Sequence, residues 1–88
     1  MYNEIMFWVY VLRSQKDNKF YTGMTNNLKR RLIEHNLGMK STPSTHNRGP
    51  FSLIHEEVSK TRDEARRKEK WFKSGAGREW IKNKYIPG

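Results

Sequence analysis

The sequence predicts one small α+β domain with the element order strand, strand, helix, strand, helix, helix. Its 88 residues suffice for one hydrophobic core and are too few for two. Short apolar runs rich in β-branched and aromatic residues alternate with segments of helical spacing. Aromatic residues make up 12% of the chain, which argues against disorder despite its polarity. We therefore expect residues 1–88 to form a single folded domain.

The chain is strongly basic. Eighteen Lys and Arg against nine Asp and Glu give a net charge of +9. The positive charge is clustered in 29–31 and 66–73, which favours a nucleic-acid partner over a merely solubilising surface or a membrane. The chain has no cysteine, so disulfides and thiol nucleophiles are excluded and a reducing cytoplasm is compatible. The apolar run 5–12 is too short to span a bilayer, and we expect no targeting segment.

The first two strands are predicted to form a hairpin. Residues 5–12 are continuously apolar and too short for a typical helix, so we expect a central strand that is buried on both faces. The polar stretch that follows has turn residues at Asp17 and Asn18. Residues 20–24 then resume an extended pattern, as the second strand of a hairpin does.

The length of the hairpin loop decides which faces its side chains share. A two-residue loop would pair position 14 with Tyr21 and position 12 with position 23. Tyr21 would then lie on the same face as Tyr10. A loop with an odd number of residues would put the two tyrosines on opposite faces, and the sequence leaves the loop length open.

The next segment has the pattern of an amphipathic helix. Thr25 or Asn26 can cap it, Leu28 and Leu32 form an apolar stripe, and residues 36–38 supply its stop. Arg31 and His35 are also four residues apart and therefore project together beside that stripe. There they can meet side chains of the sheet.

Residues 38–50 have no periodicity, and a loop this long in so small a domain is usually functional or mobile. Residues 51–58 read as a third strand, and its charged end at Glu56 and Glu57 favours an edge position. The three histidines have no metal-ligand spacing, so we expect His46 and His55 to be ordinary loop or surface residues.

Two helices are predicted to complete the domain. Thr61 and Glu64 fit a capping box, which indicates a helix over 62–73 that ends at Ser74-Gly75. A short last helix is expected over 78–85, with glycines letting the chain turn before it. Its expected apolar face consists of Trp80, Ile81 and Tyr85.

The helix over 62–73 has one acidic residue on its predicted inward stripe. The spacing of Ala65 and Phe72 places Glu69 there, where a carboxylate needs a cation. One explanation is an ion pair with a neighbouring arginine such as Arg31 or Arg66. The other is a divalent metal, and Mg²⁺ suits it because water and phosphate oxygens complete its coordination beside one or two carboxylates. The residues alone leave both explanations open.

Five sequence elements together resemble the GIY-YIG nuclease domain family. In chain order they are Val9-Tyr10, Tyr21-Thr22-Gly23, Arg31, His35, and Ala65 with Glu69. Five elements at family-like spacings are more specific than any single motif. The resemblance covers about residues 5–85 and is closest to the small stand-alone members, relatives of the catalytic domain of the excision-repair endonuclease C subunit. It therefore suggests a role in DNA repair.

The resemblance implies a three-stranded antiparallel sheet flanked by helices, and phosphodiester hydrolysis with one bound Mg²⁺ or Mn²⁺. It implies that Tyr21 activates the attacking water and that Tyr10 hydrogen-bonds in the same site. Arg31 would stabilise the charge growing on the scissile phosphate, and Glu69 would hold the metal. His35 occupies a place where the family carries a polar or aromatic site residue.

The chain departs from the family pattern at several positions. Trp8 replaces the family's first glycine, Thr22 stands in place of isoleucine, and Met24 stands in place of a lysine that some members carry. Asn83 is a candidate substitute for an asparagine that in some members follows the metal-site helix.

The implied role of a tyrosine as a base depends on its protonation. A tyrosine with an ordinary pKa of ~10 is a weak base at pH 7. We expect the basic surroundings to favour its phenolate form.

The predicted function is a metal-dependent endonuclease that acts on DNA. We expect no appended recognition domain in so short a chain. We therefore expect the protein to recognise DNA structure rather than base sequence. One alternative is a non-catalytic module that binds nucleic acid, with RNA included, and another is a protein-interaction adaptor anchored by Trp71 and Trp80. Candidate contacts to backbone phosphates are Lys29, Arg30, Arg48, Arg66, Arg67 and Lys70.

Overall fold

The computed structural model describes residues 6–37 and 50–86. The loop predicted over 38–50, with His46 and Arg48, lies outside the described residues except for Pro50. The observed order confirms the predicted α+β class. The elements are β1 (Phe7–Ser14), β2 (Phe20–Thr25), α1 (Leu28–Leu37), β3 (Phe51–Ser59), α2 (Arg62–Lys73) and α3 (Gly75–Tyr85).

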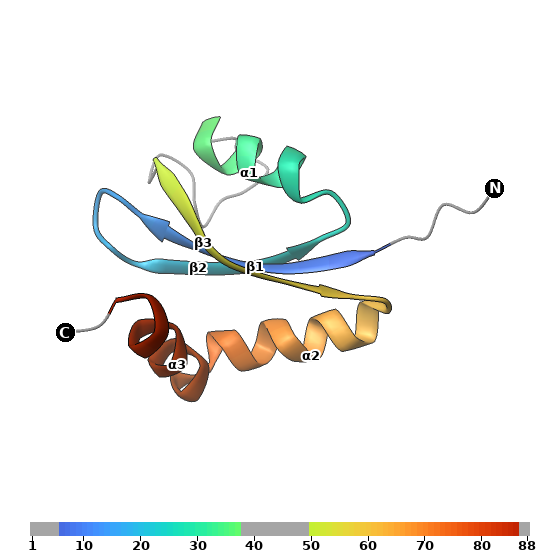
Figure 1. Ribbon diagram of the computed structural model, residues 1–88. Coiled ribbons are helices and arrows are strands. Elements are labelled where there is room, and N and C mark those ends of the chain that lie inside the picture. The colour runs from blue at the N-terminus through green and yellow to red at the C-terminus, as the bar shows by residue number, and fades with distance from the viewer. Residues whose placement is uncertain (1–5, 38–49, 87–88) are drawn as a thin grey trace.

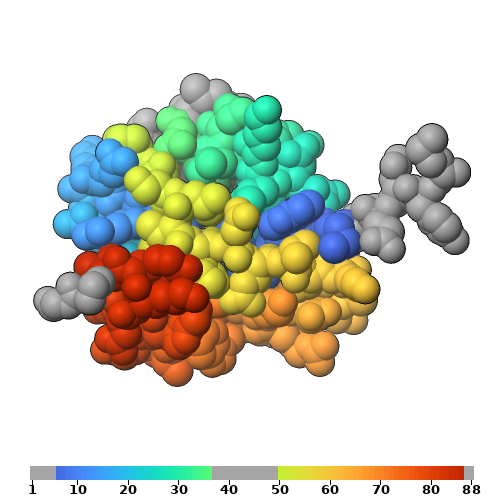
Figure 2. All heavy atoms as spheres, viewed as in Figure 1, coloured from blue at the N-terminus to red at the C-terminus, as the bar shows by residue number. Residues whose placement is uncertain are grey.

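The three strands form one antiparallel sheet in the order β2-β1-β3. The predicted central place of the first strand and edge place of the third are therefore confirmed. Helix α1 covers one face of the sheet, whereas α2 and α3 cover the other (Figure 1). Figure 2 shows β3 exposed along one side of the molecule, between α1 and the two later helices. No helix within the described residues is long and apolar enough to cross a membrane.

Strand β1 supplies the core on both faces because its side chains alternate. Val9 and Val11 face α2 and α3, where they pack with Ala65, Phe72 and Ile81. Tyr10 and Leu12 face α1, where they pack with Phe51 and with the partly buried leucines 28 and 32. All four of these β1 side chains are buried, as expected for a strand covered on both faces.

The observed hairpin register differs by two residues from the predicted one. Tyr10 pairs with Gly23 and Leu12 with Tyr21, so the pairing of position 14 with Tyr21 that a two-residue loop would give is not the observed one. The Ser14 amide donates to the Lys19 carbonyl at 2.9 Å, which leaves four residues in the loop. The Ser14 hydroxyl accepts the amides of residues 16 and 17, and this local turn lengthens the loop. Four is an even number, so Tyr10 and Tyr21 do share a face.

The helix caps confirm one prediction and correct another. Asn27 caps α1, because its side-chain oxygen accepts the Arg30 amide at 3.1 Å and its carbonyl accepts the Arg31 amide. Thr25 does not cap the helix; instead its hydroxyl accepts the Asn27 amide at 3.0 Å and holds the cap. Helix α2 has the predicted bounds, and the Thr61 hydroxyl accepts the Glu64 amide at 3.2 Å.

Helix α3 begins at Gly75, three residues before the predicted start. The reason is that the Ser74 hydroxyl accepts the Gly77 amide and so caps a helix that includes both glycines. Gly77 is buried against α2, where an added Cβ would lie 2.1 Å from the Trp71 carbonyl oxygen. The expected apolar face is only partly covered, because Ile81 is buried while Trp80 and Tyr85 stay exposed.

His55 is not the surface or loop residue that the sequence suggested. It lies on β3 with its ring packed against Phe72, Trp80 and Tyr85. One ring nitrogen hydrogen-bonds the Tyr85 hydroxyl, and the other lies 2.8 Å from a carboxylate oxygen of Glu57. His55 therefore joins the end of α3 to the sheet.

The two glycines at the start of α3 predict opposite effects of substitution. Gly77→Ala should lower the free energy of unfolding by about 1–3 kcal/mol, because the added Cβ would overlap backbone atoms of α2, which cannot move away without straining that helix. Gly75→Ala is the matched control, since its Cβ has nothing within 4 Å and alanine favours a helix. Urea unfolding of both variants measures the difference. Equal stabilities would contradict the close approach of α3 to α2.

Candidate active site

Tyr10 is buried and its ring lies across the neighbouring strand at Gly23. An added Cβ at position 23 would lie 2.4 Å from the Tyr10 hydroxyl oxygen and 2.7 Å from its Cζ. Only glycine leaves room for the ring, because any larger residue would meet the phenol directly. The absence of a side chain at Gly23 therefore lets the Tyr10 hydroxyl reach over the edge strand β2.

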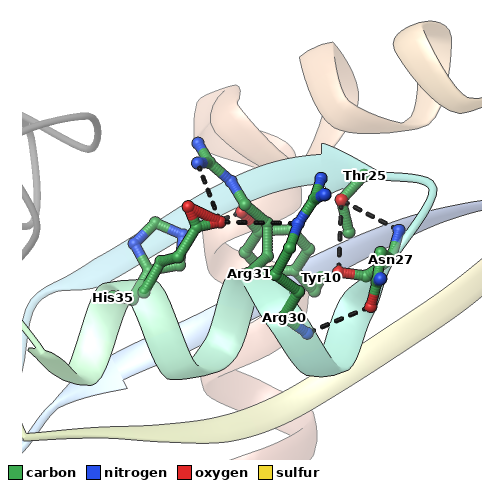
Figure 3. A network of polar contacts seen from close by, with 7 residues as sticks. Tyr10, Thr25, Asn27, Arg30, Arg31 and His35 are labelled. Atoms are coloured by element: carbon green, nitrogen blue, oxygen red, sulfur yellow. Dashed lines mark hydrogen bonds and ion pairs between the residues drawn. The ribbon is translucent and has the colours of Figure 1, made fainter.

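His35 lies next to this hydroxyl on the α1 side of the sheet. The Tyr10 oxygen and the His35 Nε2 are 2.8 Å apart, and both side chains are buried (Figure 3). Burial lowers the pKa of His35 below its ordinary value of 6.5, and the positive charge of Arg31 lowers it further against the opposing charge of Glu34. His35 is therefore neutral at pH 7 and can accept a hydrogen bond from a phenol.

Burial also controls the protonation of Tyr10. It raises the pKa of the hydroxyl above its ordinary value of 10.0, and this effect outweighs the hydrogen bond and the charge of Arg31, which lower it. The charges of Glu69 and Glu34 add to the rise. The basic surroundings therefore do not make Tyr10 a phenolate. Tyr10 lies between Arg31 and His35, and its protonated hydroxyl can donate a hydrogen bond to the His35 Nε2.

Arg31 is held in place from its own helix. Its Nη1 lies 3.7 Å from a carboxylate oxygen of Glu34, which also pairs with Arg30 at 3.8 Å (Figure 3). Less than a third of the Arg31 side chain is exposed, compared with 65% for Arg30. Of the two arginines, Arg31 is the one whose charge acts on Tyr10 and His35.

Tyr21 shares a pocket of about 330 Å³ with Tyr10 and His35. Its ring packs edge-on against Phe51, with centroids 5.2 Å apart. The pocket also includes Thr22 of β2 together with residues of α2 and α3, so it reaches both faces of the sheet around the β2 edge. Sequence reasoning did not single out two of its basic residues, Lys73 and Arg78. For Lys73, the four-residue spacing from Glu69 was an available signal.

Glu69 lies on the opposite face of the sheet from the two tyrosines. It lines a separate pocket with Met24, Thr25 and Asn26 at the end of β2 and with Arg62 and Arg66. About a fifth of its side chain is exposed, and its carboxylate lies 3.5 Å from the Lys73 Nζ. The cation that pairs with Glu69 is therefore Lys73. The sequence suggested Arg31 or Arg66 instead. The charge of Glu69 still raises the pKa of Tyr10, so the two groups act on each other around the β2 edge.

The residues around Glu69 offer a sparse set of metal ligands. Among residues 6–37 and 50–86, no group of three or more His, Cys, Asp or Glu side chains is placed to hold a metal ion. Among the described lining residues of its pocket, Glu69 is the one carboxylate, with Thr25 and Asn26 beside it, while Arg62 and Arg66 in the same lining and Lys73 add positive charge. Such a set would hold a hard cation only weakly, together with water and substrate phosphate.

The candidate phosphate contacts are divided between two faces. Lys29 and Arg30 are exposed on α1, whereas Arg66, Arg67 and Lys70 are exposed on α2 across the sheet. The fold does not bring these two groups into one patch, because the sheet separates their helices (Figure 1).

Comparisons with known proteins identify the family of the chain. The GIY-YIG catalytic domain model matches residues 6–85. The chain is 40% identical over 68 residues to a UPF0213 protein of Clostridium perfringens, covering 77% of this chain and 71% of that protein. It is 35% identical over 75 residues to a UPF0213 protein of Staphylococcus haemolyticus, covering 85% and 89%. The solution NMR structure of a UPF0213 protein from Bacillus halodurans has a TM-score of 0.56 and 33% identity, covering 93% of this chain and 88% of that one. The chain belongs to the GIY-YIG catalytic domain family.

Proposed function

We propose that this protein is a metal-dependent endonuclease that hydrolyses phosphodiester bonds in DNA and recognises DNA structure rather than base sequence. The observation that carries the proposal is the hydrogen-bonded pair of Tyr10 and His35, which lines one pocket with Tyr21 at the β2 edge. Membership of a nuclease domain family supports a nucleic-acid substrate.

The two tyrosines have different roles in this proposal. Tyr10 keeps its proton because burial raises its pKa, so it acts as a hydrogen-bond donor and not as a base. His35 accepts that hydrogen bond and fixes the direction of the hydroxyl. Tyr21, on the same face and in the same pocket, has the role of general base: its phenolate form takes the proton of the attacking water and becomes the neutral phenol.

Arg31 stabilises the negative charge that grows on the scissile phosphate. Its guanidinium is preorganised because Glu34 holds it at 3.7 Å and because it also hydrogen-bonds Tyr10. Fixed positive charge of this kind needs no rearrangement during the reaction and is often the largest single contribution to catalysis. A planar donor also suits phosphate oxygens better than an ammonium does.

Glu69 is the proposed ligand of one Mg²⁺ or Mn²⁺ ion. When bound, the ion supplies positive charge that stabilises the leaving oxygen. Lys73 neutralises the same carboxylate, so an ion has to compete with this lysine. Binding of the metal should therefore be weak until substrate phosphate is present.

The exposed basic residues of α1 and α2 are proposed to contact backbone phosphates. Phosphate contacts position a nucleic acid without reading its bases, which supports structure-directed recognition. The proposed set is Lys29, Arg30, Arg66, Arg67 and Lys70, with Arg48 outside the described residues.

Glu69→Gln should reduce Mg²⁺-dependent cleavage at least about 100-fold, because the ion contributes several kcal/mol to the transition state. Glu64→Gln is the matched control: it lies on the same helix, is paired with Lys68 at 3.7 Å and should cleave within twofold of the unaltered protein. The assay follows labelled duplex and branched DNA on gels, with Mg²⁺, Mn²⁺ or EDTA.

The same assay can reject the proposal. Cleavage that persists in both Glu69→Gln and Arg31→Ala would point to a contaminating nuclease. DNA binding by the unaltered protein without any metal-dependent cleavage would instead favour a non-catalytic binding module.

The neutral His35 predicts a pH dependence of folding stability. Its folded pKa lies below 6.5, so below about pH 6.5 the unfolded chain takes up a proton before the folded one does. Stability should then fall with decreasing pH by up to about 1.4 kcal/mol per pH unit, until His35 in the fold is itself protonated. Urea unfolding from pH 7.5 to 5 measures this slope.

His35→Gln provides the control, because glutamine does not titrate while His55 and the carboxylates remain. We expect a shallower slope in the variant. Identical slopes in the two proteins would show that His35 has an unperturbed pKa and would remove the support for a neutral acceptor next to Tyr10.

A further inference from the structure

A second, larger pocket borders the candidate active site. It measures about 850 Å³ and lies between the turn of the β1–β2 hairpin and α3. Phe20 and Arg78 line both this pocket and the one that holds the two tyrosines. The two depressions therefore lie next to each other, with these two residues at their common border. We call the larger pocket the hairpin–α3 groove.

The groove is strongly positive. Its charged lining residues are four cations and one acid, namely Arg13, Lys19, Arg78, Lys82 and Glu79. Asn18 and Asn83 add amide groups that can donate hydrogen bonds. Arg78 and Lys73 continue the positive charge into the smaller pocket. A polyanion that lay across both pockets would thus meet cations in each of them.

Arg13 belongs to the lining of this groove. It pairs with Phe20 across the hairpin, and both residues line the groove. The buried Arg13 Nε has no hydrogen-bond partner among the described residues. Because this atom is not accessible from the groove, it is the charge of Arg13 that a phosphate in the groove would meet.

We propose that the hairpin–α3 groove binds the phosphate backbone of the DNA strand whose scissile phosphate lies in the tyrosine pocket. This inference rests on the proposed function and deepens it by giving the path of the substrate strand. The sequence pointed instead to basic residues on the outer sides of α1 and α2, and neither of those groups lines the groove. The groove, in contrast, shares the lining residues Phe20 and Arg78 with the tyrosine pocket.

The test removes two groove charges and compares the result with two charges removed elsewhere. Lys19→Gln/Lys82→Gln alters exposed groove residues and leaves Arg78, which also lines the tyrosine pocket. The control is Lys60→Gln/Lys84→Gln, which lowers the net charge equally. Lys60 is exposed before α2, and the Lys84 ammonium lies 4.8 Å from the Trp80 ring centre, away from the groove lining.

Binding is measured in EDTA, so that cleavage does not interfere, by fluorescence anisotropy of labelled single-stranded and duplex DNA over a range of salt. The groove variant should bind at least about tenfold more weakly at 0.1 M salt. Its plot of log affinity against log salt should be shallower by about 2, because two phosphate contacts are lost. The control should stay within about twofold of the unaltered protein. Thermal melting confirms that both variants are folded.

Equal weakening of the two variants would show that total charge alone matters and would overturn the proposal, as would a groove variant that binds normally. Cleavage with Mg²⁺ separates this inference from the proposed function. If the unaltered protein cleaves DNA while the groove variant binds as well as it does, the groove is wrong and the nuclease stands. If only the groove variant loses binding but no protein cleaves, the groove stands and the nuclease is wrong.

Discussion

The contact between Tyr10 and Gly23 is the constraint on which the candidate site depends. A buried phenol that crosses an antiparallel strand pair needs a partner without a side chain, and Gly23 is that partner. The crossing brings the hydroxyl within reach of His35 and Arg31 from the helix above. Burial then keeps the phenol protonated although the chain has a net charge of +9. The same packing thus sets both the position and the protonation state of the central group.

The order of the strands explains why the site lies at β2. Helix α1 carries Arg31 and His35 on one face of the sheet, while α2 carries Glu69 on the other. A sheet separates groups on its two faces, so they can act on one substrate only around an edge. At the β2 edge the tyrosine pocket takes residues from both layers, and the Glu69 pocket adjoins the end of the same strand. At the β3 edge, His55 hydrogen-bonds the hydroxyl of Tyr85 and so connects α3 to the sheet.

The sequence was informative wherever local periodicity decides the outcome. Element types and the central first strand could be predicted. The shared face of the two tyrosines could be predicted only on condition that the hairpin loop has an even number of residues, and the structure supplies that number. The register could not be predicted, since it depends on how the Ser14 hydroxyl turns the chain. The start of α3 depends on the close packing of Gly77 against α2, and the protonation of Tyr10 depends on burial. Composition reveals none of these three-dimensional effects.

We propose that Glu69 belongs, around the β2 edge, to the same site as the two tyrosines. Paramagnetic broadening by Mn²⁺ of the amide NMR signals, recorded with a non-hydrolysable DNA, tests it most directly. We expect broadening centred on Glu69 and on residues 21–26 of β2 and its end, and its loss in Glu69→Gln. Broadening centred on Glu57 and Glu64 near β3, or unchanged in Glu69→Gln, would contradict the claim.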